Sequence, residues 1–178
     1  MPRIAPVTPN DTPQRSQPLL DAVEKKLGRI PNMLRTLAHS PAGLGFYLAQ
    51  TQALAGGTLA PQLREQIALT AAGFNGCDYC ACAHALAGKI SGIDPAEIAG
   101  NLAGRSAHQQ TQAVLDFVTH ILATAGHVDD DALLAIRQAG YGDGAIVEII
   151  AHVGMNLFTN YFNHIAAPVI DFPPVSAR

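Results

Sequence analysis

The 178-residue sequence contains no tryptophan, and charged residues make up only 14% of it, well below the usual value of about 25%. The formal net charge is -3, so the chain has no basic surface of the kind that holds nucleic acid or an anionic membrane. Hydrophobic residues reach 48%, which excludes a disordered chain. So few charges cannot cover a large solvent-facing surface. We therefore expect some outer helix faces to be buried in a homo-oligomer.

Long apolar runs are also missing. The longest candidate, near residues 145–158, is interrupted by Glu148 and His152 and falls short of the ~18 residues that a membrane helix needs. The first 17 residues contain no apolar segment typical of a secretory signal. Three cysteines without such a signal do not fit a disulfide-stapled secreted fold. The expected location is the cytoplasm.

Strand signals are absent as well, because no segment shows sustained alternation of apolar and polar residues. We expect an extended, proline-rich arm at residues 1–17, followed by a single all-helical domain at residues 18–178. The predicted fold class is a compact, all-α bundle of several helices.

Capping signals predict where these helices begin and end. Gly28 closes the first helix, and Ser40-Pro41 opens a second that runs to about Leu54. A third helix is expected from Pro61 toward Gly73, and another begins after the Asn75-Gly76 turn. Capping boxes at 94–97 and at 106–109 (S-x-x-Q) predict two more helix starts, the first of these helices ending near Gly100. The acidic run at 129–131 opens a helix that ends at Gly140, and the last helix is expected from Asp143 to about Ala166.

The most informative stretch is Cys77-x-x-Cys80-x-x-x-His84. At about 100° per residue, these three side chains fall within one arc of a helix, whereas Cys82 points away and is interpreted as a small buried hydrophobic residue. A thiol near a helix N-terminus has a lowered pKa, and His84 is placed to shuttle a proton. Glu65, on the preceding helix, could hold the His84 tautomer or take the proton from a thiol.

Three interpretations of this stretch compete. The first is redox chemistry, since a C-x-x-C pair can form a disulfide without large backbone motion. The second is a metal site, because Cys77, Cys80 and His84 are plausible Zn²⁺ ligands, although no second Cys/His knuckle supplies the fourth. The third is a helical core with inert, reduced thiols.

A second polar pattern lies in the last helix, where His152, Asn156, Asn160 and His164 follow each other at i+4 spacing, with Asn163 beside them. This stripe needs partners if it is buried. Either it ties helices or subunits together, or it lines the pocket of the thiols.

Glu65-x11-Cys77-x2-Cys80-x3-His84 resembles the signature of alkylhydroperoxidase D-like proteins in the carboxymuconolactone decarboxylase superfamily. The segments at 28–41 and 158–173 resemble the N-terminal helix junction and the C-terminal segment of its peroxidase-related members. The resemblance covers residues 18 to 174.

This resemblance implies an all-helical trimer or hexamer that reduces organic or hydrogen peroxides. Cys80 would attack the peroxide, Cys77 would resolve the sulfenic acid as a disulfide, and Glu65 and His84 would relay protons. A dihydrolipoyl-bearing or thioredoxin-like dithiol would reduce the disulfide, and neither a cofactor nor a metal would be required.

The chain departs from the founding members at one position. They carry a histidine immediately before the second cysteine, where this sequence has Tyr79. A phenol with a pKa near 10 does not relay protons at pH 7 as an imidazole does. Two other functions stay open: a non-enzymatic, redox-sensing or ligand-binding oligomer of the same fold, and a carboxymuconolactone decarboxylase-type enzyme. That decarboxylase branch lacks the C-x-x-C pair.

Overall fold

The computed structural model describes residues 1–177, and all regular structure in this range is helical, as the sequence predicts. Within these residues, no helix has both the length and the apolar character that crossing a bilayer demands. The elements are α1 (Gln17–Leu27), α2 (Asn32–Leu37), α3 (Pro41–Ala55), α4 (Pro61–Asn75), α5 (Asp78–Ile90), α6 (Pro95–Leu102), α7 (Gln109–Ala123), α8 (Asp130–Gln138) and α9 (Asp143–Ala166).

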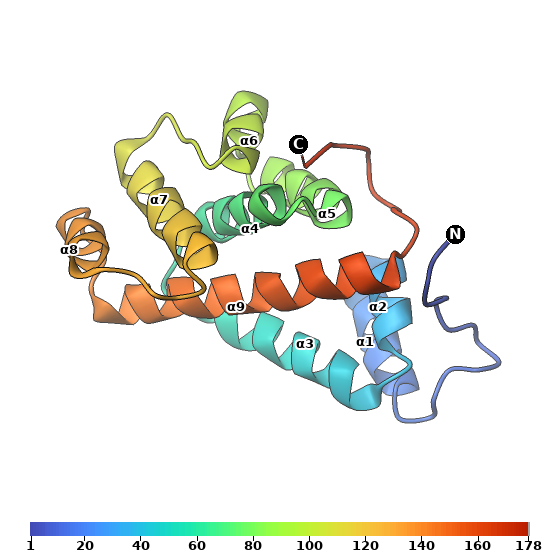
Figure 1. The fold of residues 1–178 in the computed structure, drawn as a ribbon. Coiled ribbons are helices and arrows are strands. Elements are labelled where there is room, and N and C mark those ends of the chain that lie inside the picture. The colour runs from blue at the N-terminus through green and yellow to red at the C-terminus, as the bar shows by residue number, and fades with distance from the viewer. Residues whose placement is uncertain (178) are drawn as a thin grey trace.

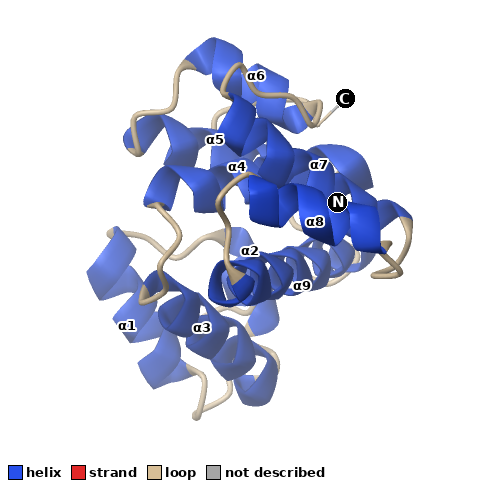
Figure 2. Ribbon diagram, turned by 90° about the vertical axis from the view of Figure 1, so that its left-hand side faces the viewer, coloured by secondary structure: helices blue, strands red, loops and turns tan. Residues whose placement is uncertain are grey.

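Helix α4 is the centre of the fold and packs against α5, α6, α7 and α9. The long helix α9 crosses the molecule beside it, with α3 along its other side and α7 and α8 around its N-terminal half (Figure 1). Figure 2, turned by 90°, shows α1 and α3 together on one side of the molecule and α4, α5 and α6 on the other.

The sequence of α4 explains its central place. No charged side chain follows Glu65 in this helix, and small residues alternate with Ile67 and Leu69, both fully buried. Gly73 allows the closest approach, because a Cβ atom there would lie 1.8 Å from the carbonyl oxygen of Leu102 in α6. Every residue from Gln66 to Ala72 is buried, so this part of the helix has no side that faces solvent.

Several predicted helix ends are confirmed by their caps. Gly28 ends α1 in the left-handed conformation (φ 72°), and the Ser40 side chain accepts a hydrogen bond from the Gly43 N–H at the start of α3. The Asp129 carboxylate caps α8 in the same way, and α9 spans Asp143–Ala166 as predicted. Local sequence therefore defines these ends.

Two predicted capping boxes are wrong in detail. Helix α7 begins at Gln109 after His108, not at Ser106, because the Ser106 backbone N–H donates to the Gln112 side chain and its hydroxyl bonds Glu97. Asp94 does cap α6, but Glu97 does not reach back to it and instead accepts from Ser106, Ala107 and Asn101. Tertiary partners replace the expected local ones. The short helix α2 was not predicted.

The N-terminal arm and the described part of the C-terminal segment both lie against the helical body. Residues 1–15 form no helix but dock on it, since Arg3 and Ile4 donate to the Ala166 carbonyl and Val7 donates to the Arg35 carbonyl. After α9, the segment at 167–177 (the C-terminal tail) turns back toward α5 (Figure 1). This tail ends beside the first turn of α5, where Ala177 donates its N–H to Asp78.

Candidate functional site

The cysteine pair lies at the junction of α4 and α5. Gly76 ends α4 in the left-handed conformation (φ 67°), and the Cys77 N–H donates to the Ala72 carbonyl (2.9 Å). Cys77 is the N-cap of α5, with an extended backbone, and its sulfur accepts a hydrogen bond from the Cys80 N–H (3.4 Å). Helical spacing predicted that Cys77 lies within the helix. Cys77 is instead the N-cap, and this position brings its sulfur to the Cys80 N–H.

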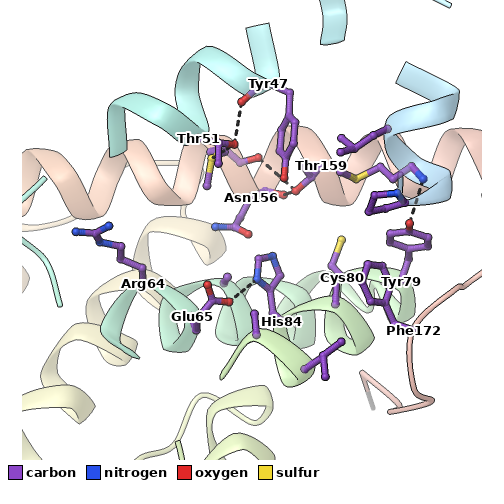
Figure 3. A pocket seen from close by; sticks show the side chains of 18 of the residues that line it. Tyr47, Thr51, Arg64, Glu65, Tyr79, Cys80, His84, Asn156, Thr159 and Phe172 are labelled. Carbon is purple, nitrogen blue, oxygen red and sulfur yellow. Dashed lines mark hydrogen bonds and ion pairs between the residues drawn. The ribbon is translucent and has the colours of Figure 1, made fainter. Parts of the chain in front are cut away.

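Cys80 and His84 lie one turn apart on the same face of α5 and project into a cavity (Figure 3). The cavity has a volume of about 500 Å³. Helices α3 and α9 face it from the other side with Tyr47, Thr159 and Asn156 (Figure 3). Cys80 lines this cavity, whereas Cys77 lies behind it and is almost fully buried, with 1% of its surface exposed.

Glu65 and His84 form an ion pair across α4 and α5. The His84 Nδ1 lies 2.8 Å from the Glu65 Oε2, and the two side chains are 26% and 23% exposed. Burial lowers the pKa of His84, but the hydrogen bond and the charge of Glu65 outweigh it, so the pKa is raised above its ordinary value. The structure thus joins the carboxylate and the imidazole, and it keeps the imidazole available as a proton donor.

The two thiols have opposite acidities. A hydrogen bond between the two thiol side chains lowers the pKa of Cys80 most, and although burial opposes it, hydrogen bonds with Asn163, Asn160 and Thr159 lower the pKa further. The same bond with Cys80, together with burial, raises the pKa of Cys77. Cys80 is therefore the more acidic thiol of the pair, and Cys77 is the one that holds its proton more firmly.

Asn163, which the predicted site did not include, is a direct partner of the Cys80 sulfur. Its Nδ2 donates to the Cys80 Sγ (3.2 Å) and also lies 3.4 Å from the Met33 Sδ. An N–H aimed at sulfur favours the negatively charged form. The only signal in the sequence was the polar stripe on α9, because nothing local links Asn163 to a cysteine 83 residues earlier.

The polar stripe on α9 combines both of its predicted roles. His152, Asn156 and Asn163 line the cavity, while Asn160 ties two helices together by accepting from the Asn75 side chain (2.8 Å). His164 lies outside this group; it is exposed and contacts the Gly76 carbonyl. Burial lowers the pKa of His152, and the nearby Arg64 lowers it further, so this imidazole is neutral at pH 7.

The third cysteine faces the opposite side of α5, as predicted. Cys82 is buried, and its thiol donates to the Val175 carbonyl and accepts from the Val175 N–H, both at 3.2 Å. It lines a second, largely apolar cavity of about 750 Å³ between α5, α6 and the C-terminal tail. Cys82 is thus separated from the Cys77–Cys80 pair.

The metal interpretation finds no support in the side-chain geometry. Among the residues that the structure describes, no three His, Cys, Asp or Glu side chains gather as a metal site requires. The Nδ1 of His84 is directed at Glu65 rather than shared with the thiols. The arrangement can instead supply a nucleophilic thiolate, a second thiol beside it and a proton donor.

These features define an all-helical protein that holds a vicinal dithiol next to a carboxylate–imidazole pair. The model of the carboxymuconolactone decarboxylase family matches residues 41–122, which include all four of these side chains, so this segment belongs to that family. The superfamily inferred from the sequence is confirmed. No curated protein matches the chain.

Solved structures show the same fold over nearly the whole chain. An uncharacterised peroxidase-related protein from Ralstonia eutropha JMP134, described as an alkylhydroperoxidase AhpD core, is 24% identical, with a TM-score of 0.81 over 98% of this chain and 92% of its own. One from Silicibacter sp. TM1040 is 22% identical, with a TM-score of 0.80 over 97% and 93%.

A third neighbour is a cysteine-to-alanine variant of the debrominase Bmp8 in complex with 2,3,4-tribromopyrrole. It is 18% identical, with a TM-score of 0.79 over 95% of this chain and 91% of its own. At such identities these three structures establish the fold alone.

Proposed function

We propose that this protein is a thiol-dependent peroxidase that reduces organic or hydrogen peroxides through a Cys77/Cys80 dithiol–disulfide cycle. The observation that carries the proposal is the placement of the Cys80 sulfur in the cavity, with the Cys77 thiol behind it and the Glu65–His84 pair one turn away. Each of these groups supplies something that peroxide reduction requires.

In the first step, the Cys80 thiolate attacks one oxygen of the peroxide R–O–O–H. A sulfur–oxygen bond forms, the oxygen–oxygen bond breaks, and the departing alkoxide takes a proton from His84. Cys80 becomes a sulfenic acid and the peroxide leaves as an alcohol, or as water when R is hydrogen. Sulfur is oxidised by two electrons, and the oxygen–oxygen bond accepts them.

In the second step, the Cys77 sulfur attacks the Cys80 sulfenic acid. A sulfur–sulfur bond forms, and the hydroxyl of the sulfenic acid leaves as water with the proton of the Cys77 thiol. The raised pKa of Cys77 keeps that proton in place until this step. An external dithiol then reduces the disulfide by exchange and is itself oxidised. A dihydrolipoyl-bearing or thioredoxin-like protein is the proposed reductant.

Mass spectrometry after addition of sub-stoichiometric tert-butyl hydroperoxide tests the proposal. The peptide that contains Cys77 and Cys80 should lose two hydrogen atoms. Cys80→Ser should abolish turnover, whereas Cys77→Ser should trap a sulfenic acid on Cys80. Cys82→Ser is the matched control and should retain turnover, because Cys82 faces the second cavity.

Other results would contradict the proposal. A dithiol that stays reduced after prolonged exposure excludes peroxide chemistry. Oxidation without repeated turnover under either dithiol reductant, together with a changed assembly mass in light scattering, identifies a redox sensor instead.

We also propose that the protein acts as a homo-oligomer in the cytoplasm, as a trimer or a hexamer. Four apolar side chains along one face of α9 are exposed in the single chain: Val147, Ile150, Tyr161 and Ile165. An apolar helix face of this kind is typical of a subunit interface. Light scattering of the reduced protein tests this proposal.

A further inference from the structure

The tyrosine between the two cysteines has both of its hydrogen-bonding capacities occupied. Tyr79 is 5% exposed; its hydroxyl accepts from the Met33 N–H (3.0 Å) and donates to the Asp171 Oδ1 (2.8 Å). Its ring meets the ring of Phe172 edge to face, with 5.4 Å between centroids. Burial raises the pKa of this phenol, so it keeps its proton and does not relay one. Through these contacts, the Tyr79 side chain connects α5 to α2 and to the C-terminal tail.

Asp171 connects this side chain to a third segment of the chain. Its Oδ2 accepts from the Asn32 N–H (3.1 Å) and from the Arg29 guanidinium (3.4 Å), which also donates to the Asp171 carbonyl (2.7 Å). The same guanidinium lies over the Phe172 ring, 4.6 Å from its centroid. We call the resulting group the Tyr79 latch; it comprises Arg29, Asn32, Met33, Tyr79, Asp171 and Phe172.

The rest of the C-terminal tail is attached to the same end of α5. Ala177 donates to the Asp78 carboxylate (2.9 Å), and Val175 makes both of its backbone hydrogen bonds to the Cys82 sulfur. Residues on both sides of Cys80 are therefore tied to one tail. The Cys82 thiol, 1% exposed, is covered by that tail.

On its other side the latch reaches the reactive sulfur. Tyr79 holds the backbone of Met33, and the Met33 sulfur contacts the Asn163 amide that donates to Cys80. Arg29, Met33, Tyr79 and Phe172 also line the cavity, and Figure 3 shows Tyr79 and Phe172 beside Cys80. The residues of the Tyr79 latch therefore line the cavity on the side where the Cys80 sulfur lies.

We infer that Tyr79 is a positioning residue: it fastens the C-terminal tail to the redox turn and, through Met33 and Asn163, holds the hydrogen bond that stabilises the Cys80 thiolate. At position 79, where a histidine could relay protons, this chain has a tyrosine that holds the C-terminal tail against the site. This role does not depend on which oxidant Cys80 meets.

Site-resolved alkylation of the reduced protein with iodoacetamide, followed by mass spectrometry, tests the inference without any peroxide. In Tyr79→Phe, the tail loosens, and Cys82 should be alkylated about fivefold faster, the factor that follows from loss of one buried hydrogen bond. The pH–rate profile of Cys80 should move upward by about half a unit, because its hydrogen bond to Asn163 weakens. Tyr141→Phe, at a tyrosine that packs against the separate cluster of Val114, Ile136 and Ile149, is the matched control and should change neither quantity.

Two further variants separate the parts of the latch. Asn163→Ala should shift the Cys80 profile upward while Cys82 stays protected, because the tail remains fastened. Asp171→Ala should release Cys82, whereas Asp171→Asn, which keeps an oxygen that can accept from the phenol, should retain most of the protection.

The inference is overturned if Cys82 in Tyr79→Phe reacts as slowly as in Tyr141→Phe and the pH–rate profile of Cys80 does not move. It is equally overturned if Cys77, Cys80 and Cys82 accelerate together with loss of helicity, since that pattern means general unfolding rather than release of the tail.

Discussion

Replacing Glu65 with Gln tests whether the carboxylate sets the proton supply of the site. In the wild-type protein, the Glu65 Oε2 lies 2.8 Å from the His84 Nδ1 and raises the pKa of His84 against the opposing effect of burial. Glutamine preserves the shape and a hydrogen bond but removes the charge. Burial then prevails, so the pKa of His84 falls and less imidazolium is present at pH 7.

The size of this effect follows from the contact. A hydrogen bond to a charged group contributes about 1.5–3 kcal/mol, and one pKa unit corresponds to about 1.4 kcal/mol. Because Gln retains a neutral hydrogen bond and both side chains are about a quarter exposed, we expect the lower end of this range, about one unit. Above the pKa of His84, that shift reduces the protonated fraction about tenfold.

Stopped-flow measurement of single-turnover peroxide cleavage between pH 5 and 9 provides the assay. The wild-type rate should rise as the Cys80 thiolate forms and fall as His84 loses its proton. In Glu65→Gln, the descending limb should move about one unit to lower pH, while the ascending limb stays in place. Glu148→Gln removes a carboxylate whose partners are Thr58 and Leu59, and it should leave both limbs unchanged.

The same pair makes a separate contribution to stability. Since the folded pKa of His84 is raised, its stabilising effect is fully present below the unfolded value of about 6.5 and is lost as the pH rises through the folded value.

In the stopped-flow assay, a descending limb that is identical in wild type and Glu65→Gln would refute the assignment of His84 as the proton donor.

Two further predictions concern the scaffold. Gly73→Ala should destabilise the protein by about 3 kcal/mol in urea unfolding, because its Cβ would overlap the Leu102 carbonyl. Gly154→Ala, in an open position on α9, should instead stabilise it by about 0.5–1 kcal/mol. Equal effects of the two substitutions would contradict the close packing of α4 and α6. Glu148 accepts hydrogen bonds from the Thr58 and Leu59 N–H groups, and these lower its pKa. The stability that Glu148 contributes is present above the unfolded pKa of about 4.3 and is lost as the pH falls through the lowered value, so unfolding between pH 3 and 6 should depend less on pH in Glu148→Gln.

The parts of the fold that the sequence predicts are those defined by contacts within a few residues. The caps at Gly28, Ser40 and Asp129 need no partner from elsewhere in the chain, so their positions can be read directly. Ser106 has the same local pattern, but Glu97 and Gln112 compete for it, and the helix begins later. A capping motif is reliable only where no tertiary partner competes.

The site follows the same division. Spacing alone places Cys80 and His84 on one face of α5, and the junction at Gly76 brings Cys77 beside them. The contacts of Tyr79 and Asn163 join residues that are 46 to 130 positions apart, and no periodicity encodes such pairings. The reactive groups could be predicted, but the side chains that orient them depend on how the tail and α9 pack.

The cap at the start of α5 connects covalent chemistry to the backbone. The Cys77 sulfur accepts the hydrogen bond from the Cys80 N–H, and it is also the sulfur that would bond to Cys80 in a disulfide. Any covalent modification of Cys77 therefore changes the N-cap hydrogen bond of the first turn of α5. Deuterium exchange at the Cys80 amide therefore reports the covalent state of its neighbour, and it distinguishes intact from modified protein without any added label.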